Sequence, residues 1–269
     1  MTKTSIIAFC LAIALPSMAG AQVHEDTDYD FRARISAELD KKIVGGLHAN
    51  ISEEFRLKDN LSAVDRFYTT AGLTWKTCPY FKIGAAYTLM NLHKRADAGG
   101  WEWDLRHRAT LDLTGMYNAG YFKFSLRERF QLTHRTGEMN IYQNPRNAFA
   151  LRSRLKVAYV SPSKPIEPYV SVEVRNTLNN VRYNDVYVDR VRLQPGIEWR
   201  LNRRQTLDFY LLGDYTYDKS YDAKKNGNLK VVEDASGMPV YDAYGDPVYA
   251  IFYEKAWHFS LGVSYSYAF

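Results

Sequence analysis

The sequence predicts an all-β fold, a transmembrane antiparallel up-and-down β-barrel of ten to twelve strands. Three observations support this prediction. The last thirteen residues alternate between apolar side chains at odd positions and small or polar ones at even positions. The same two-residue period recurs along the chain from Phe31 onward, between polar breaks. After the N-terminal segment, no apolar run reaches the roughly 18 residues that a transmembrane helix needs.

The final segment, 257–269, shows the pattern best and is predicted to be the strand that closes the barrel. Its apolar face consists of Trp257, Phe259, Leu261, Val263, Tyr265, Tyr267 and Phe269. A strand of this length exceeds the roughly 9 to 11 tilted residues that cross a hydrocarbon core. Because it ends on an aromatic residue, it resembles the C-terminal signal strand of bacterial outer-membrane barrels.

The composition is compatible with such a barrel. The 269 residues are 46% hydrophobic with a mean hydropathy of -0.39, values that would also suit a soluble protein. In a barrel, however, lipid-facing and lumen-facing residues alternate and cancel in the average. The formal charge of +5 does not indicate a nucleic-acid partner, because the basic residues are spread over the alternating segments rather than gathered in one patch.

The N-terminus is predicted to be a cleaved export signal at 1–21. Lys3 is followed by an apolar core at 5–15 and an Ala-Gly-Ala site at 19–21. Residues 22–30 then form a short acidic leader, whose His24, Glu25, Asp26, Asp28 and Asp30 are either solvated or ligands of a divalent cation. Cys78 is the sole cysteine after cleavage, so no internal disulfide is expected.

The barrel itself is predicted to occupy 31–269. Its alternating segments are 31–40, 47–57, 67–75, 81–89, 103–113, 122–132, 149–159, 169–175, 190–201, 207–217 and 257–269. These are eleven segments, whereas bacterial barrels normally close with an even number of strands. We therefore prefer ten or twelve strands, with 31–40 not a full strand or a further strand hidden within 218–256.

The breaks between the segments alternate in length. Short turns are predicted at 76–79, 117–120, 161–165 and 202–204, and longer loops at 93–102, 135–147, 176–185 and 218–256. Short periplasmic turns and long external loops are typical of outer-membrane barrels. The longest loop carries a near-repeat, 239–243 and 247–250, around 244–246, which predicts a hairpin. Its tyrosines and acids either contact glycans or a partner protein or form an inert surface.

The charged face of the strands should point into the lumen, because an Arg or Lys facing lipid at mid-bilayer costs about 2 to 4 kcal/mol. The predicted lumen network consists of Arg32, Arg34, Glu38, Glu54, Arg56, Arg106, Arg108, Arg127, Arg129, Arg152, Arg154, Glu173, Arg175, Arg190, Arg192, Glu198 and Arg200. Ion pairs would largely fill a narrow lumen and give the protein a structural or interaction role. Alternatively, the arginine excess would make a narrow channel that favours small anions.

An outer-membrane lipid hydrolase is a third reading, but the sequence offers no catalytic, cofactor or metal motif for it. Such an enzyme needs a nucleophile beside an oriented histidine. Among the six histidines only His48 and His258 are predicted to face inward, and neither shares a recognisable motif with a serine. We therefore expect no enzyme and no cofactor.

Several short motifs in this order resemble a known family, the outer-membrane barrels of domain of unknown function 2490 (DUF2490). The motifs are 54–56 with 58–60, 72–76, 84–87, 125–131, 151–154 and 192–196, and the similarity extends over the whole mature chain. The resemblance implies a monomeric barrel in the outer membrane of a Gram-negative bacterium, with lipid and the barrel-assembly machinery as partners. It supplies no established activity or catalytic residue. The loop at 218–256 and Cys78 depart from the family pattern.

Overall fold

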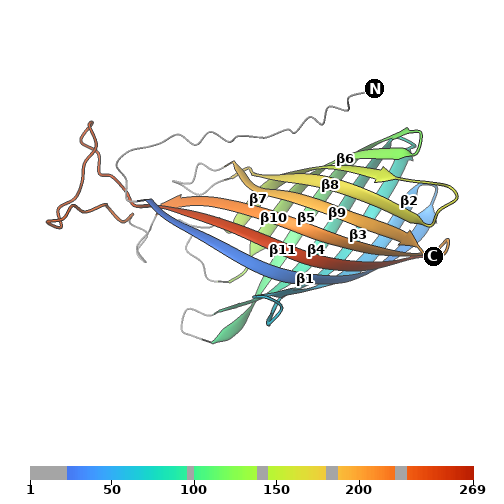
Figure 1. Cartoon of the computed structure of the whole chain (residues 1–269), viewed down its shortest axis with the longest axis horizontal. Helices are drawn as coiled ribbons and strands as arrows, with labels where there is room; N and C mark the ends of the chain where they lie inside the picture. Colours follow the sequence, from blue (N-terminus) through green and yellow to red (C-terminus); the bar gives the residue numbers. More distant parts are fainter. Residues whose placement is uncertain (1–22, 96–99, 138–144, 180–186, 222–228) are drawn as a thin grey trace, which may run out of the picture.

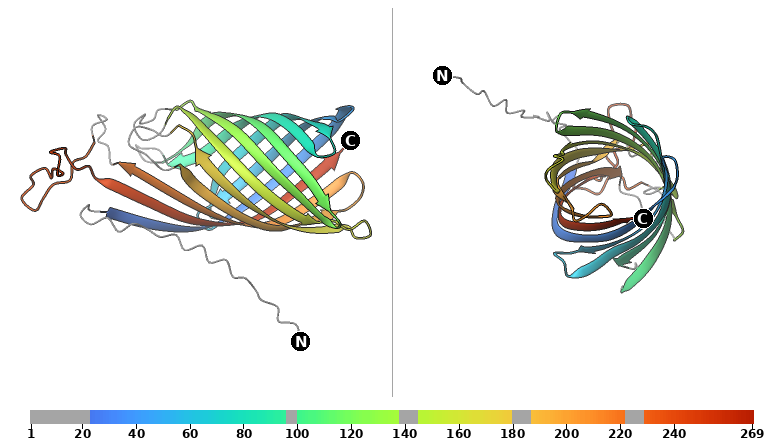
Figure 2. Two further views of the ribbon diagram at one scale, coloured as in Figure 1. Left: turned by 90° about the horizontal axis from the view of Figure 1, so that it is seen from above. Right: turned by 90° about the vertical axis from the view of Figure 1, so that its right-hand side faces the viewer.

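The protein is a closed β-barrel, seen here in a computed structural model that describes residues 23–95, 100–137, 145–179, 187–221 and 229–269 (Figure 1). The described chain contains eleven strands: β1 (Val23–Val44), β2 (Leu47–Lys58), β3 (Ala63–Cys78), β4 (Phe81–Arg95), β5 (Trp101–Ala119), β6 (Phe122–Arg135), β7 (Asn147–Tyr159), β8 (Ile166–Thr177), β9 (Val188–Arg200), β10 (Gln205–Tyr221) and β11 (Ile251–Ala268). Seen along its axis, the wall forms a closed ring (Figure 2). No helix in these residues is long and apolar enough to cross a membrane.

All eleven predicted segments are strands, but the preference for ten or twelve strands was wrong. Consecutive strands pair in antiparallel fashion, and each hairpin reverses the direction of the chain. With eleven strands the first and the last therefore run in the same direction, so the barrel has to close through a parallel pair. β1 and β11 form this pair from Val23 opposite Ile251 to Asp40 opposite Ala268, which covers all of β11 and all but the last four residues of β1.

β1 begins before the expected start of the barrel. The residues from 23 to 30, which we expected to form an acidic leader, belong to the strand. At the end of this stretch the buried carboxylate of Asp30 accepts a hydrogen bond from the backbone N–H of Asn60 at 2.9 Å and another from Arg32 Nε. Asp30 thus ties β1 to the turn between β2 and β3. The predicted signal peptide lies outside the described residues.

The alternation of side chains is confirmed along the wall. On β9 the side chains of Val191, Leu193 and Ile197 are exposed on the outer surface, whereas Arg190 and Arg192 line the lumen. On the closing strand Phe259 and Leu261 are exposed, whereas His258 and Ser260 are buried inside. A shift of pairing by one residue would exchange the two faces, and this fixes the register of the strands.

The connections at the two ends of the barrel differ in length, as predicted. The end that holds the C-terminus has turns at 45–46, 79–80, 120–121, 160–165 and 201–204. The opposite end has one tight turn, 59–62, and the longer connections 96–100, 136–146, 178–187 and 222–250. The longest one is shorter than the predicted 218–256, because β10 and β11 extend into it.

The near-repeat in this longest connection forms the predicted hairpin, which projects from the end of the barrel (Figure 1). Tyr241 bridges Pro247, and the backbone N–H of Asp242 donates to the carbonyl of Asp246 at 2.8 Å. An earlier turn is closed by Asp234, whose carboxylate accepts hydrogen bonds from the hydroxyl and the N–H of Ser236 and from the N–H of Met238. The hydrogen bond from the Ser236 hydroxyl and those from the amides lower the pKa of the Asp234 carboxyl.

Two lumen-facing glycines are covered by tyrosine rings of the neighbouring strand. Gly196 lies opposite Tyr169, and Gly262 lies opposite Tyr210. A Cβ atom on Gly196 would lie 2.5 Å from the Tyr169 ring, and one on Gly262 would lie 2.0 Å from Cζ of Tyr210. The absence of a side chain therefore lets each ring lie flat on the wall, an arrangement that shields backbone and strengthens strand pairing.

We predict that Gly262→Ala destabilises the barrel, because the new methyl group would displace the Tyr210 ring. Such overpacking typically costs about 1 to 3 kcal/mol. Urea unfolding of the protein in detergent micelles measures the effect. Gly213→Ala is the matched control, since the nearest atom to its added Cβ is 4.0 Å away. Equal unfolding midpoints for the two variants would contradict the packing argument.

Candidate functional site

The candidate site is the lumen, which contains two polar cavities. The larger has a volume of about 880 Å³ and the smaller, toward the C-terminal end of the barrel, about 330 Å³. Asp112, Arg127 and Arg154, together with Thr74 and Gly84, line both cavities and mark the place where they meet. Thirteen arginines but only seven carboxylates line the larger cavity within the described part of the chain, so its wall carries a surplus of positive charge.

Strand register brings the arginines together. Arg129 of β6 lies opposite Arg152 of β7, which lies opposite Arg175 of β8, which in turn lies opposite Arg190 of β9. Like charges directly opposite each other on neighbouring strands repel. This row is therefore stable only if carboxylates from adjacent rows reach between the guanidinium groups.

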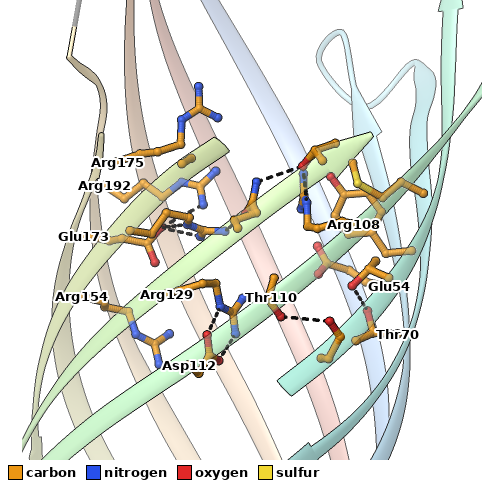
Figure 3. A pocket seen from close by; sticks show the side chains of 18 of the residues that line it. Glu54, Thr70, Arg108, Thr110, Asp112, Arg129, Arg154, Glu173, Arg175 and Arg192 are labelled. Carbon is orange, nitrogen blue, oxygen red and sulfur yellow. Dashed lines mark hydrogen bonds and ion pairs between the residues drawn. The ribbon is translucent and has the colours of Figure 1, made fainter. Parts of the chain in front are cut away.

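Glu173 of β8 is the central carboxylate of the network (Figure 3). Its buried Oε1 and Oε2 accept hydrogen bonds from Arg152 Nε at 3.0 Å, from Arg192 Nη1 at 3.3 Å and from Arg127 Nη2 at 3.0 Å. Arg192 also donates to the buried Asp214 of β10 at 3.0 Å. Glu173 thus connects its own strand β8 to β6, β7 and β9, and Arg192 extends the chain of ion pairs to β10.

Other ion pairs hold several further charges. Arg129 donates two hydrogen bonds to Asp112, at 2.6 Å each, in the bidentate geometry that suits a guanidinium and a carboxylate. Arg175 pairs with Asp189 and Arg106 with Asp104. The sequence predicted a network of this kind in the lumen, although it did not identify Asp189 as a member.

A second cluster surrounds the buried Tyr68 of β3. The Arg56 guanidinium lies 4.6 Å from the centre of its ring, that of Arg108 lies 5.5 Å away, and Arg66 Nη1 donates to its hydroxyl at 3.1 Å. An aromatic ring attracts cations through its face, so Tyr68 brings together like charges that would otherwise repel. The sequence pattern placed Tyr68 on the inner face but did not indicate this role.

Most residues of the predicted network line the cavities. The larger cavity is lined by Arg34, Glu38, Glu54, Arg56, Arg106, Arg108, Arg127, Arg129, Arg152, Arg154, Glu173, Arg175, Arg190 and Arg192, and the smaller one also by Glu198. The other two, Arg32 and Arg200, line neither cavity. Arg32 pairs with Asp30, and the exposed Arg200 pairs with Glu167 at 2.9 Å near the C-terminal end.

Three carboxylates of the network were missed by the sequence analysis. Asp214 occupies an even position of β10, as does Asp208, which lines the larger cavity, but the sequence analysis overlooked it. Asp65 and Asp189 have odd numbers, like the outward-facing Phe67 and Val191 on the same strands, so the alternation predicts that they face outward. Each is, however, the extra residue of a β-bulge. A bulge re-aims the side chain of its extra residue, and here it turns both carboxylates toward inward arginines.

The histidines that the sequence singled out lie inside the wall. His48 Nδ1 is 2.7 Å from Asp40 Oδ1, and His258 is buried opposite Asp30 and Asp214. Ser260, on the same strand as His258, is buried, and its hydroxyl has no hydrogen-bond partner among the described residues. Within those residues no cluster of three or more His, Cys, Asp or Glu side chains is arranged to hold a metal ion.

The chain belongs to the family described as "Protein of unknown function (DUF2490)", whose model matches residues 31–225. This match confirms the resemblance inferred from the sequence motifs. It begins at the predicted first residue of the barrel and ends shortly after β10, so the closing strand β11 lies beyond it. No curated protein matches the chain.

We predict that Glu173→Gln lowers the free energy of unfolding by about 3 kcal/mol, because it leaves three buried arginines without their shared counter-charge. Urea unfolding in detergent micelles measures the change. Glu102→Gln is the control, since its ion pair with Lys94 is exposed and contributes less than about 1 kcal/mol. The network would not be a source of stability if the two variants unfolded at the same urea concentration.

Proposed function

We propose that this protein is an integral barrel of the bacterial outer membrane, exported with a cleaved signal peptide, that lets small anions pass through its lumen. Outer-membrane lipid surrounds it, the barrel-assembly machinery inserts it, and it acts as a monomer. The proposed function includes no chemical step.

Membrane insertion is supported by the outer surface of the wall. Large apolar side chains such as Ile35, Leu126, Val172, Leu193 and Leu261 are exposed there, far more than a soluble protein leaves in contact with water. Such a belt is stable when lipid covers it, since burying apolar surface is worth roughly 25 cal/mol per Å².

Aromatic residues border this belt on both sides, as they do in transmembrane barrels. On β11, Trp257 and Tyr267 stand ten residues apart on the outer face. With about 3.3 Å per residue and a tilt of about 40°, the two lie about 25 Å apart along the membrane normal, the usual height of an apolar band.

Passage of anions is supported by the surplus of arginine around two cavities that meet inside the lumen. A pore wall with fixed positive charges attracts anions and repels cations. The arginines are held by strands and ion pairs, so the positive field has a fixed position. This charge surplus is the single observation that favours the proposal over a lumen filled by ion pairs.

A second candidate function is an interaction role with a lumen closed to ions. The hairpin at the end of the barrel favours it, because Tyr244 is 93% exposed and Tyr241 and Met238 are also largely exposed. Exposed aromatic side chains on a projecting loop are suited to contact a glycan or a partner protein. Conductance separates the two candidates.

We predict that Leu193→Arg impairs insertion into lipid vesicles. Leu193 is exposed near the middle of β9, and an arginine facing mid-bilayer costs about 2 to 4 kcal/mol. Refolding yield into vesicles, followed by sedimentation, measures insertion. Leu178→Arg makes the same change in a connecting loop and should insert normally. Normal yields for both variants would argue against a lipid-facing belt.

We predict that the purified protein in planar bilayers gives currents that favour chloride over potassium, and that Arg127→Glu reduces this preference. Arg127 lies where the cavities meet, so reversing its charge changes the field there. Reversal potentials in a salt gradient measure selectivity. Arg203→Glu is the control, because Arg203 lies in an exposed turn. An absence of current, or a preference for cations, would reject anion passage and leave the interaction role.

A further inference from the structure

The smaller cavity combines positive charge with carboxylates that are already occupied. Three carboxylates line it, and each has a basic partner. Asp112 is held by Arg129, Glu198 pairs with Lys156, and Glu167 pairs with Arg200. Lys82, Lys123 and Arg154, which also line this cavity, have no carboxylate partner within the described part of the chain.

Arg154 is the clearest of these groups. It lies directly opposite Arg127 across the β6–β7 pair, where like charges repel. Across the β7–β8 pair it lies opposite Glu173, whose oxygens instead accept hydrogen bonds from Arg127, Arg152 and Arg192. Within the described part of the chain it forms no hydrogen bond or ion pair, and its Nε is buried without a partner. Figure 3 shows Arg154 beside the Asp112–Arg129 pair with no contact marked to either.

Arg127 and Lys82 belong to the same positive group. Arg127 uses one Nη atom to bind Glu173, while its Nε is buried without a partner. Lys82 enters the cavity from β4 and is repelled by the charges of Lys123, Arg154 and Arg127. Three strands thus direct basic side chains toward one place.

Donors that are buried and unpaired cost free energy that a ligand recovers when it pairs with them. Guanidinium groups suit oxyanions, since their planar N–H donors match two oxygens at once. A phosphate group carries about 1.5 to 2 negative charges near pH 7, which would offset most of the local surplus. The cavity, at about 330 Å³, has room for such an ion with water.

We propose that the smaller cavity, at the end where it meets the larger one, is a binding site for a small dianionic oxyanion of the phosphate or phosphate-monoester class, held by Arg127, Arg154 and Lys82. This inference rests on the proposed function, because the ligand reaches the site through the lumen. It deepens that function by giving the lumen a saturable site for one class of anion.

Calorimetric titration with inorganic phosphate tests the site directly. The full mature protein is folded in a detergent that has no phosphate headgroup, in a buffer without other multivalent anions. We expect saturable binding of one phosphate per chain, and potassium chloride at the same ionic strength should give no comparable heat. Absence of saturable binding, or equal binding of chloride, would overturn the proposal.

Variants locate the site. Arg154→Gln should weaken phosphate binding by roughly tenfold or more, the effect of losing a charged hydrogen-bond donor. Arg154→Lys should retain part of the affinity, and Arg203→Gln, in an exposed turn outside both cavities, should retain all of it. If Arg154→Gln does not fold, Lys82→Gln is measured in its place. Unchanged affinity in a folded Arg154 or Lys82 variant would overturn the assignment.

The titration and the conductance measurement can reject the binding site and the anion passage separately. Phosphate binding without current would retain the site and reject the passage. Anion current with no phosphate binding in the folded wild-type protein would retain the passage and reject the site.

Discussion

This barrel depends on ion pairs between carboxylates and the arginines that face one another on neighbouring strands. Neighbouring strands set Arg129, Arg152, Arg175 and Arg190 in one row, and that row would repel itself without Glu173 and the other acids near it. The same ion pairs enforce the register, since a slip by one residue would move charges to the apolar outer face and leave their partners buried alone. Alternation and ion pairing therefore specify one pairing of the wall.

The parallel closure of the wall follows from the odd number of strands and the direction of the chain rather than from side chains. An even barrel begins and ends at the same end of the wall, whereas here β1 starts at the end with the long connections and β11 finishes at the other. Closure through a parallel pair replaces the usual antiparallel one. Parallel pairs are slightly less stable per residue, and the long contact from Val23 to Asp40 compensates for this.

Much of this structure could be predicted from the sequence, because the period of two is a local property. Alternation placed Arg192 and Glu173 inside and Leu193 outside without any knowledge of the fold. It failed at Asp65 and Asp189, since one inserted residue in a strand reverses the parity and leaves no mark in composition. The strand number also failed, because a general preference for even barrels was given more weight than the eleven segments in the chain.

The sequence pattern does not indicate which inward-facing charges form ion pairs with each other. Arg152 and Arg154 stand two residues apart on one strand and have the same pattern around them, yet Arg152 binds Glu173 and Arg154 has no partner among the described residues. The difference arises from the orientation of Glu173 on the adjacent strand β8, which lies opposite Arg154 but directs its oxygens to Arg152. Paired arginines stabilise the wall, whereas unpaired ones keep their donors free for a solute. The distribution of pairs along the lumen, rather than the number of arginines, therefore determines where an anion would bind.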